Sequence, residues 1–370
     1  MPKIQFKFQE VLVYIILFCL PLLVFPFGIS YFELPKVFAS ELLIELLAIS
    51  LLLTVTSSFW RISSQTNFIL LGLLIISLID LIFMPGQDYF FGNGFRLQGI
   101  FLFWHLMLLT FLASRLKEQT YHWLGYLIPI LILLGSTFIF GSNQDNRIVG
   151  TLGEPNALGA VALFYLPFIY LTNSQNKIKI ILIFLGTIIS LYIITVSGSK
   201  SALLGFVIEA TFLLLTMVFN FSVKKTLILC LIILLLSLTA PFFQKELLFE
   251  NRSEVWTTAW NAGLQKPILG WGIGNTQTAL HETSKIINNN IQYQVVDSSH
   301  NIFLDFWVQT GVTGLAFFIT LVIISFKNFL TSKNLLYLTL LLGLLTTASF
   351  NPLSVVSLVA FWWVIGQGLK

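Results

Sequence analysis

Twelve long apolar stretches follow one another along the chain, separated by short segments that contain glycine, proline, asparagine or charged residues. They cover residues 9–27, 37–56, 68–84, 98–113, 122–140, 156–172, 178–196, 200–220, 226–242, 300–326, 333–348 and 353–369. About 20 apolar residues in a helix cross the hydrocarbon core of a bilayer, where only helices satisfy their own backbone within one segment. The pattern therefore predicts an all-α, polytopic helical membrane protein with about twelve transmembrane helices, which form a single integral membrane domain over residues 1–370.

Composition excludes the main alternatives to this fold class. Of the 370 residues, 56% are hydrophobic and 10% are charged, against roughly 25% charged residues in an ordinary soluble domain. A soluble fold would expose most of these apolar side chains, and an outer-membrane barrel would alternate apolar and polar positions. The first apolar run lacks a small-x-small cleavage site, so we expect an uncleaved first span. Cys19 and Cys230 lie within spans, where they suit small apolar packing positions better than a disulfide.

One connection differs from the others, because residues 243–299 form a long polar segment between the ninth and tenth spans. In the short loops, twelve Lys and Arg residues lie on the side of the N-terminus and four lie on the opposite side. Lysine and arginine are enriched in cytoplasmic loops. The sequence therefore predicts that both termini are cytoplasmic and that residues 243–299 form an extracytoplasmic loop.

A first polar cluster runs from Arg147 to Asn156 in an outer loop that leads into the sixth span. Pro155 and Asn156 suit a helix start, and the two glycines of the cluster let the backbone approach a ligand closely. The planar fork of donors on Arg147 suits a phosphate or diphosphate. An interfacial arginine on a lipid headgroup explains the same residues equally well.

A second cluster is the hairpin Ser197-Gly198-Ser199-Lys200-Ser201 between the seventh and eighth spans. Small residues beside one cation can form a compact corner that binds an anion. More often, such a sequence is simply a tight turn between two helices.

A short helix is predicted in the polar segment. Asn251 and Glu254 have the spacing of a capping box, whereas Gly263 suits the helix end and Pro267 prevents its continuation. The stretch Gly270–Gly274 that follows is expected to be a flexible loop, since no strand precedes it and its spacing does not fit a dinucleotide fingerprint.

Arg252, Trp256 and Trp260 recur every four residues on this helix, so they are expected to share one face. Two tryptophans on one face are typical of a helix that lies at the membrane interface. In that case Arg252 could serve only as an anchor whose charged head reaches the interface.

The fourth cluster, Asp297–Asn301, enters a tenth span that is longer than the bilayer core requires. His300 is therefore expected at or above the outer interface, where its proton is readily moved near neutral pH. A histidine at a span end is often only an interfacial residue. Gly311 and Gly314 are expected to be packing positions.

Ionisable side chains inside the spans are functional candidates by default. They are Glu41, Glu45, Asp80, His105, Glu209 and Asp305. A transporter coupled to protons would use such acids. The alternative is that a Glu209–His105 pair merely holds two helices together.

Taken in order, the four clusters resemble the O-antigen ligase and polymerase superfamily, whose members are bacterial integral membrane glycosyltransferases of the GT-C type. The resemblance covers residues 140–325 and also includes the Lys266–Gly274 stretch and the spacing of Gly311 and Gly314. The family commonly has arginine in the hairpin where this chain has Lys200, which leaves a point charge without the bidentate fork.

The resemblance implies a membrane enzyme that takes a glycan from an undecaprenyl-diphosphate-linked donor. The acceptor would be a hydroxyl on a lipid, a glycan or a protein at the outer face of the bacterial cytoplasmic membrane, with membrane lipids around the protein and no nucleic acid involved. His300 would be the catalytic base, while Arg147, Arg252 and Lys200 would hold the diphosphate. Asn156, Asn301 and Trp256 would complete the substrate site, without a metal or another cofactor.

Two other function classes remain open. A secondary transporter with twelve spans could use Glu41, Glu45 and Glu209, although the two halves lack the matching pair of broken spans typical of inverted repeats. A membrane scaffold without catalytic activity would not explain several cations and a histidine on one side.

Overall fold

The computed structural model describes most of the chain as helix. It describes residues 2–25, 30–54, 64–83, 90–94, 96–118, 121–142, 146–171, 176–239, 242, 252–288 and 296–370, and within these ranges it contains fourteen α-helices. Their bounds are α1 Pro2–Tyr14, α2 Glu33–Thr54, α3 Ser64–Phe83, α5 Ile100–Arg115, α6 Trp123–Ile139, α7 Pro155–Tyr170, α8 Asn176–Ser197, α9 Lys200–Leu213, α10 Val223–Ser237, α12 Arg252–Gln265, α13 Thr276–Ile287, α14 Ile302–Ser332, α15 Leu335–Ala348 and α16 Val355–Gly368. The all-α prediction is confirmed for this part of the chain.

Each of the twelve predicted spans coincides with one helical unit, and the first of them continues from α1 through short π and 3-10 turns to Leu22. Among the described residues, five helical segments are long and apolar enough to cross a membrane, and they lie in α2, α3, α8, α9 with its π-helical extension, and α14. Six further apolar segments in the same part of the chain are shorter. The chain is therefore a multi-pass membrane protein. The predicted span ends at 26–27, 55–56, 84, 172 and 240–241 lie outside the described residues.

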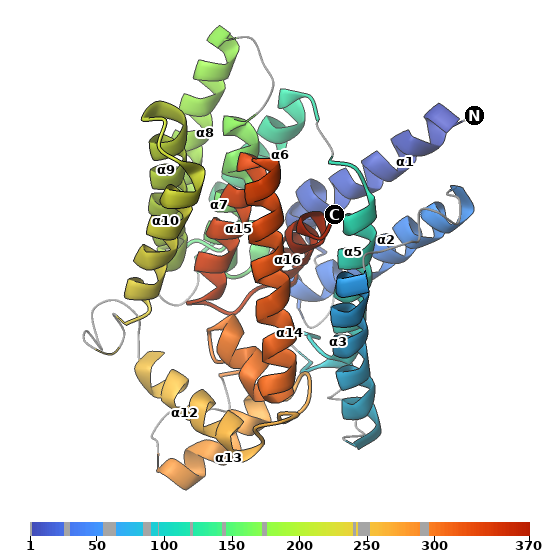
Figure 1. The fold of residues 1–370 in the computed structure, drawn as a ribbon. Helices are drawn as coiled ribbons and strands as arrows, with labels where there is room; N and C mark the ends of the chain where they lie inside the picture. Colours follow the sequence, from blue (N-terminus) through green and yellow to red (C-terminus); the bar gives the residue numbers. More distant parts are fainter. Residues whose placement is uncertain are drawn as a thin grey trace.

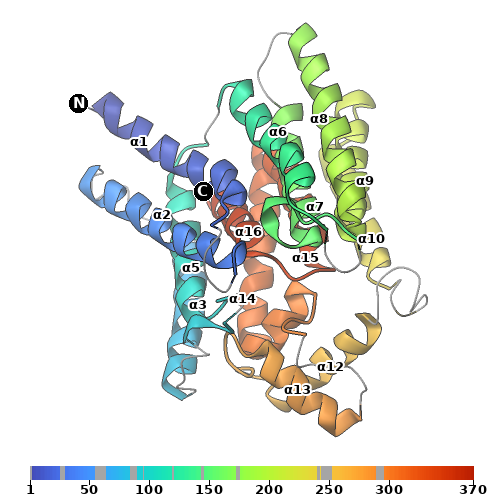
Figure 2. The ribbon, with the colours of Figure 1, turned by 180° about the vertical axis from the view of Figure 1, so that it is seen from behind.

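The centre of the bundle is formed by α7, α15 and α16, as Figures 1 and 2 show from opposite sides. Nearly all of their residues are buried, and among these are the large side chains of Phe361, Trp362 and Trp363 of α16. Such helices belong inside a protein, surrounded by others. The outer helices instead expose large apolar side chains such as Leu53 of α2 and Phe184 of α8, as expected where lipid surrounds the protein.

Helices α12 and α13 lie together at one end of the bundle, and α1 begins toward the other end (Figure 1). On α12, Trp256 is buried, with 5% of its surface exposed, whereas Trp260 is 54% exposed and stacks on Trp307 with ring centroids 5.5 Å apart. The two tryptophans of the predicted face therefore have different surroundings, since Trp256 packs instead against Phe350, with ring centroids 6.0 Å apart. Asn251 and residues 243–250 lie outside the described residues.

The long helix α14 is broken at Gly311, whose φ of 61° and ψ of −163° are not helical. The break frees the carbonyl groups of Val308 and Gln309. Backbone N–H groups from the loop between α12 and α13 bond to them: Trp271 donates to Val308 O at 2.8 Å, and Gly272 donates to Gln309 O at 2.9 Å. An interrupted helix is tolerated at membrane depth when protein groups satisfy its freed backbone.

The same loop is fixed at two further points, so the prediction of a flexible Gly270–Gly274 loop is wrong. The N–H of Val312 donates to Pro267 O at 2.8 Å, and the N–H of Ile273 donates to the Asp80 carboxylate at 3.2 Å. Asp80 therefore has a structural contact in this loop. Gly311 is not only a packing position, because it provides the break that the loop fills.

Replacing Gly311 with alanine is expected to destabilise the protein by about 1–3 kcal/mol or more, because only glycine readily adopts its backbone conformation. An added Cβ would also lie 2.5 Å from the backbone of Ile268. Thermal unfolding of the purified protein in detergent would measure this loss. As a control, Gly135→Ala adds a methyl group where nothing lies within 4 Å, and alanine favours a helix. An unchanged unfolding temperature for Gly311→Ala would contradict the strain argument.

The intramembrane acids are arranged differently from the predicted pair. His105 Nε2 lies 3.1 Å from an oxygen of Glu45, not of Glu209. The proposed Glu209–His105 pair is therefore wrong, because α5 packs against α2 and brings His105 toward that helix. Glu209 is instead buried against Gly343 of α15.

Candidate active site

The first two polar clusters meet through the side chain of Arg147. Its Nε donates to Ser197 O at 2.8 Å, and its Nη2 donates to Asn156 Oδ1 at 2.7 Å. Gly198 packs against the arginine, since a Cβ at this position would lie 3.1 Å from Arg147 Nε. The α8–α9 turn and the first residues of α7 therefore fix the orientation of this guanidinium group. Asn156, predicted to touch substrate, has a demonstrated contact with Arg147.

The loop that precedes α7 is held by buried contacts with the start of the chain. Lys36 of α2 donates from Nζ to Thr151 O at 2.8 Å, and Thr151 Oγ1 donates to Pro21 O at 3.0 Å. Gly153 follows with a φ of 72°, which a residue without a Cβ adopts easily. These contacts place Glu154 directly before the first turn of α7.

The third cluster joins the second through Asn351, which lies between α15 and α16. Arg252 Nη2 donates to Asn351 Oδ1 at 3.3 Å, and Asn351 Nδ2 donates to the Ser201 hydroxyl at the start of α9. Lys200 is exposed next to Ser201. Asn351 was not predicted as a site residue.

His300 is held by a compact set of hydrogen bonds before α14. Its N–H donates to Ser298 Oγ at 3.0 Å, and that hydroxyl donates to Asp305 at 2.7 Å. The N–H of Ser299 also donates to Asp305, at 2.7 Å. Asp305, predicted as an intramembrane acid of open role, therefore shapes the backbone around His300, which has a left-handed φ of 59°.

The His300 side chain is partly buried and feels the charges of two cations. Its Nδ1 is buried and makes no hydrogen bond with the described residues. Burial, followed by the charges of Arg252 and Arg96, holds the pKa of His300 well below its usual value. The imidazole is therefore neutral at pH 7, with a ring nitrogen available to receive a proton.

Asn301 caps α14, and this accounts for its side-chain contacts. Its Oδ1 accepts from the N–H groups of Phe303 and Leu304 at 3.0 and 3.2 Å. Its Nδ2 donates to Ser349 O at 3.0 Å, which ties the start of α14 to the end of α15. These contacts fix the backbone immediately after His300.

An ion network beside His300 was not predicted from the sequence. Arg96 pairs with Asp297 through Nε, and its Nη1 lies 3.7 Å from an oxygen of Glu154. Burial raises the pKa of Glu154, and Arg96 partly opposes this shift. Glu154 and Asp297 lay within recognised clusters, but nothing in the sequence indicated that Arg96 would join them, since it is 201 positions from Asp297.

Buried polar atoms that lack hydrogen bonds gather on α12 and at His300. Among the described residues they include Ser253 Oγ, Trp256 Nε1 and His300 Nδ1. Such atoms are rare in folded proteins, and each one calls for an explanation. Ligand oxygen atoms that accept or donate here would satisfy them. Within the described ranges, no group of three or more His, Cys, Asp or Glu side chains is arranged to hold a metal ion.

Comparison with known proteins identifies the central part of the chain. Residues 157–319 match the model of the O-antigen ligase family. This segment is similar to that family. It includes the α8–α9 turn, Arg252, Trp256 and His300, so the resemblance inferred from the motifs is confirmed. Arg147 and Asn156 lie just before the matched residues.

A curated relative extends the similarity over more of the chain. The ComP-specific O-oligosaccharyltransferase of Acinetobacter baylyi is 24% identical in an alignment of 311 positions, which covers 76% of this chain and 55% of that protein. The chain therefore spans little more than half the length of this relative.

Proposed function

We propose that this chain is a membrane glycosyltransferase that moves a glycan from an undecaprenyl-diphosphate-linked donor to a hydroxyl acceptor. One observation carries the proposal: the segment that matches the O-antigen ligase family contains both Arg252 and His300, and His300 Nδ1 is buried there without a hydrogen-bond partner among the described residues. Arg147 provides a second oriented guanidinium group near Ser197. This combination provides cations for a diphosphate and a base for a hydroxyl.

In the proposed reaction, the acceptor oxygen attacks the anomeric carbon of the donor sugar as the bond from that carbon to the diphosphate oxygen breaks. The acceptor proton passes to the free ring nitrogen of His300. The electron pair of the broken bond stays on the leaving diphosphate, and Arg147, Arg252 and Lys200 stabilise the charge that develops there. The diphosphate leaves with its lipid.

We further propose that all twelve predicted spans cross the membrane in a GT-C-like arrangement, with both termini in the cytoplasm. α12, α13 and the His300 segment would then lie on the extracytoplasmic side. The separation of α1 and α12 toward opposite ends of the bundle in Figure 2 supports this topology. The acceptor can be a lipid, a glycan or a protein; the relative's name specifies the protein ComP for that enzyme.

Reconstitution tests the function directly. The purified chain in liposomes would receive a defined undecaprenyl-diphosphate-linked oligosaccharide together with a lipid, a glycan or a serine-containing peptide as acceptor. We expect release of undecaprenyl diphosphate together with a glycosylated acceptor. If no acceptor class receives the glycan while the protein remains folded, the proposed function is wrong.

The pH dependence of transfer tests the environment of His300. Because its pKa is held below the usual value of about 6.5, the free base persists as the pH falls through 6.5, and activity should decline only at more acidic pH. Arg96→Gln removes one of the cations that lower this pKa and leaves Asp297 and Glu154 uncompensated. The acid limb of the profile of kcat/KM should therefore move to higher pH.

Arg96→Lys provides the matched control, because it keeps the positive charge and should leave the acid limb close to that of the unmodified protein. The charged groups around His300 to be considered are Arg252 on α12, Glu154 before α7, and Asp297 and Asp305 near His300 itself. An acid limb that stays in place in Arg96→Gln would show that Arg96 does not act on the base.

A further inference from the structure

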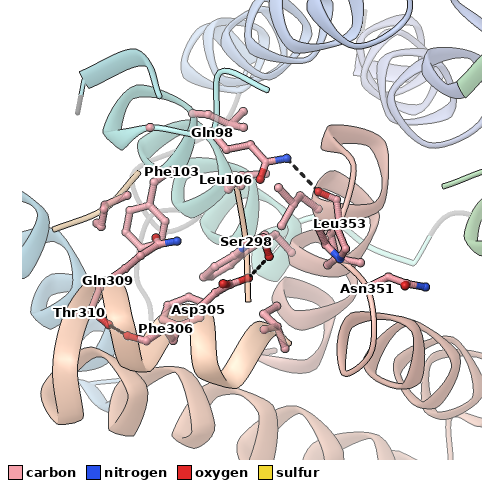
Figure 3. Close-up of a pocket in the computed structure, with 17 residues that line it drawn as sticks. Gln98, Phe103, Leu106, Ser298, Asp305, Phe306, Gln309, Thr310, Asn351 and Leu353 are labelled. Atoms are coloured by element: carbon pink, nitrogen blue, oxygen red, sulfur yellow. Dashed lines mark hydrogen bonds between the residues drawn. The ribbon is translucent and has the colours of Figure 1, made fainter. Parts of the chain in front are cut away.

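Two adjoining cavities lie beside the His300 segment, between α5, α14 and α16. The larger has a volume of about 100 Å³ and the smaller about 40 Å³. Four residues line both of them: Gln98, Ser298, Asp305 and Gln309. Figure 3 shows these side chains around the larger cavity, with Ser298 bonded to Asp305 and Gln98 bonded to the backbone of Leu353. The two spaces can therefore hold different parts of one ligand.

The larger cavity combines an aromatic wall with polar groups. Phe103, Phe306 and Trp362 form the wall, with ring centroids 5.8 Å apart for Phe103 and Trp362 and 6.4 Å apart for Phe306 and Trp362. The carboxamides of Gln98 and Gln309 can both donate and accept hydrogen bonds, whereas a carboxylate only accepts them. Apolar walls with a few polar groups are typical of small-molecule sites. A sugar ring fits this chemistry, because its C–H face is apolar and its edge carries hydroxyl groups.

The charges that line the two cavities disfavour a diphosphate. Among the described lining residues, Asp297 and Asp305 are acidic and Arg96 is basic, and Arg96 is already paired with Asp297. An anion placed here would face excess carboxylate, whereas Arg147, Arg252 and Lys200 do not line either cavity. A neutral ligand avoids this repulsion, and its hydroxyl groups can donate to the carboxylates.

Two residues connect the larger cavity to the reacting groups. Ser298 lines it and accepts the backbone N–H of His300, while Asn351 lines it and accepts from Arg252. A ligand in the cavity would thus contact residues that hold the His300 backbone and the Arg252 side chain, while the donor diphosphate is held by the cations. We infer that the paired cavities bind the acceptor, and that this acceptor is a neutral sugar residue; the inference rests on the proposed function.

Binding without turnover provides the test. The protein in lipid nanodiscs would be mixed with methyl β-D-glucopyranoside, with methyl 2-acetamido-2-deoxy-β-D-glucopyranoside or with a serine-containing peptide, and saturation-transfer NMR would detect contact. We expect saturation of the ring protons of at least one glycoside. Leu358→Trp should abolish this signal because Leu358 lines the larger cavity and the indole would fill it, whereas Leu358→Met, of similar volume, should retain it.

Gln309→Leu provides a second variant in case Leu358→Trp does not fold, and it should also lose the signal because a hydrogen-bonding carboxamide is removed. His300→Asn should keep the signal, since the ligand is bound by other residues. Saturation of the peptide alone, no saturation of either glycoside, or an undiminished glycoside signal in both cavity variants would overturn the inference. If glycosides bind in the cavity but no glycan is transferred in liposomes, the proposed function fails while the site stands.

Discussion

Replacing His300 with alanine is expected to lower glycan transfer by about 10²–10⁴-fold, the usual contribution of a positioned general base. Without the imidazole, no group at this position would accept the proton of the acceptor hydroxyl. The cations would still hold the diphosphate. The expected result is a folded, membrane-inserted protein that binds its donor but releases little undecaprenyl diphosphate. Transfer assays in liposomes at saturating donor would measure the loss as a fall in kcat.

His300 also has a left-handed backbone, so alanine changes both the chemistry and the strain. His300→Asn separates these effects, because asparagine adopts this conformation readily but cannot act as a base near neutral pH. Both variants should lose transfer, and only His300→Ala should unfold at a lower temperature. Transfer by His300→Asn at close to the normal rate would assign the acceptor proton to another group.

The local parts of this fold and site could be predicted from the sequence, because they depend on neighbouring residues. Apolar runs located the twelve helical units of the predicted spans, and the four polar clusters contained Arg147, Lys200, Arg252 and His300. The α8–α9 turn appeared where serine and glycine interrupted two spans. Hydropathy and turn chemistry act within a few residues, so one sequence is sufficient to detect them.

The contacts that join these parts could not be predicted, because they link residues far apart in the chain. Asn351 bonds to Ser201 across 150 positions, and Arg96 reaches Asp297 across 201. Gly311 was expected to be only a packing position. The loop after α12, which bonds to the helix break at Gly311, can be recognised as its partner only once the loop and the helix are placed together. Similarly, burial and the charges of Arg252 and Arg96 lower the pKa of His300, and no local pattern contains that information.

Removing the guanidinium group of Arg252 is the second change with a large expected effect. Arg252→Ala should lower transfer by about 10²–10³-fold, as is typical when one group that stabilises developing charge is lost. Arg252→Lys should recover only part of this loss, because an ammonium group supplies charge without the planar fork that suits a diphosphate. The measurement is kcat/KM for the lipid-linked donor, with release of undecaprenyl diphosphate followed in liposomes.

The same variants should affect His300 in a way that distinguishes a charge effect from loss of structure. Arg252 lowers the pKa of His300. In Arg252→Ala, the acid limb of the pH profile of the residual activity should therefore move to higher pH, whereas in Arg252→Lys, which keeps the charge, it should stay in place. Lys285→Ala is the matched control: this exposed cation on α13 pairs with Glu282 at 3.0 Å, and its loss should leave both rate and profile unchanged. If Lys285→Ala reduced transfer as strongly as Arg252→Ala, a general loss of surface charge would explain the result, and Arg252 would have no specific role at the diphosphate.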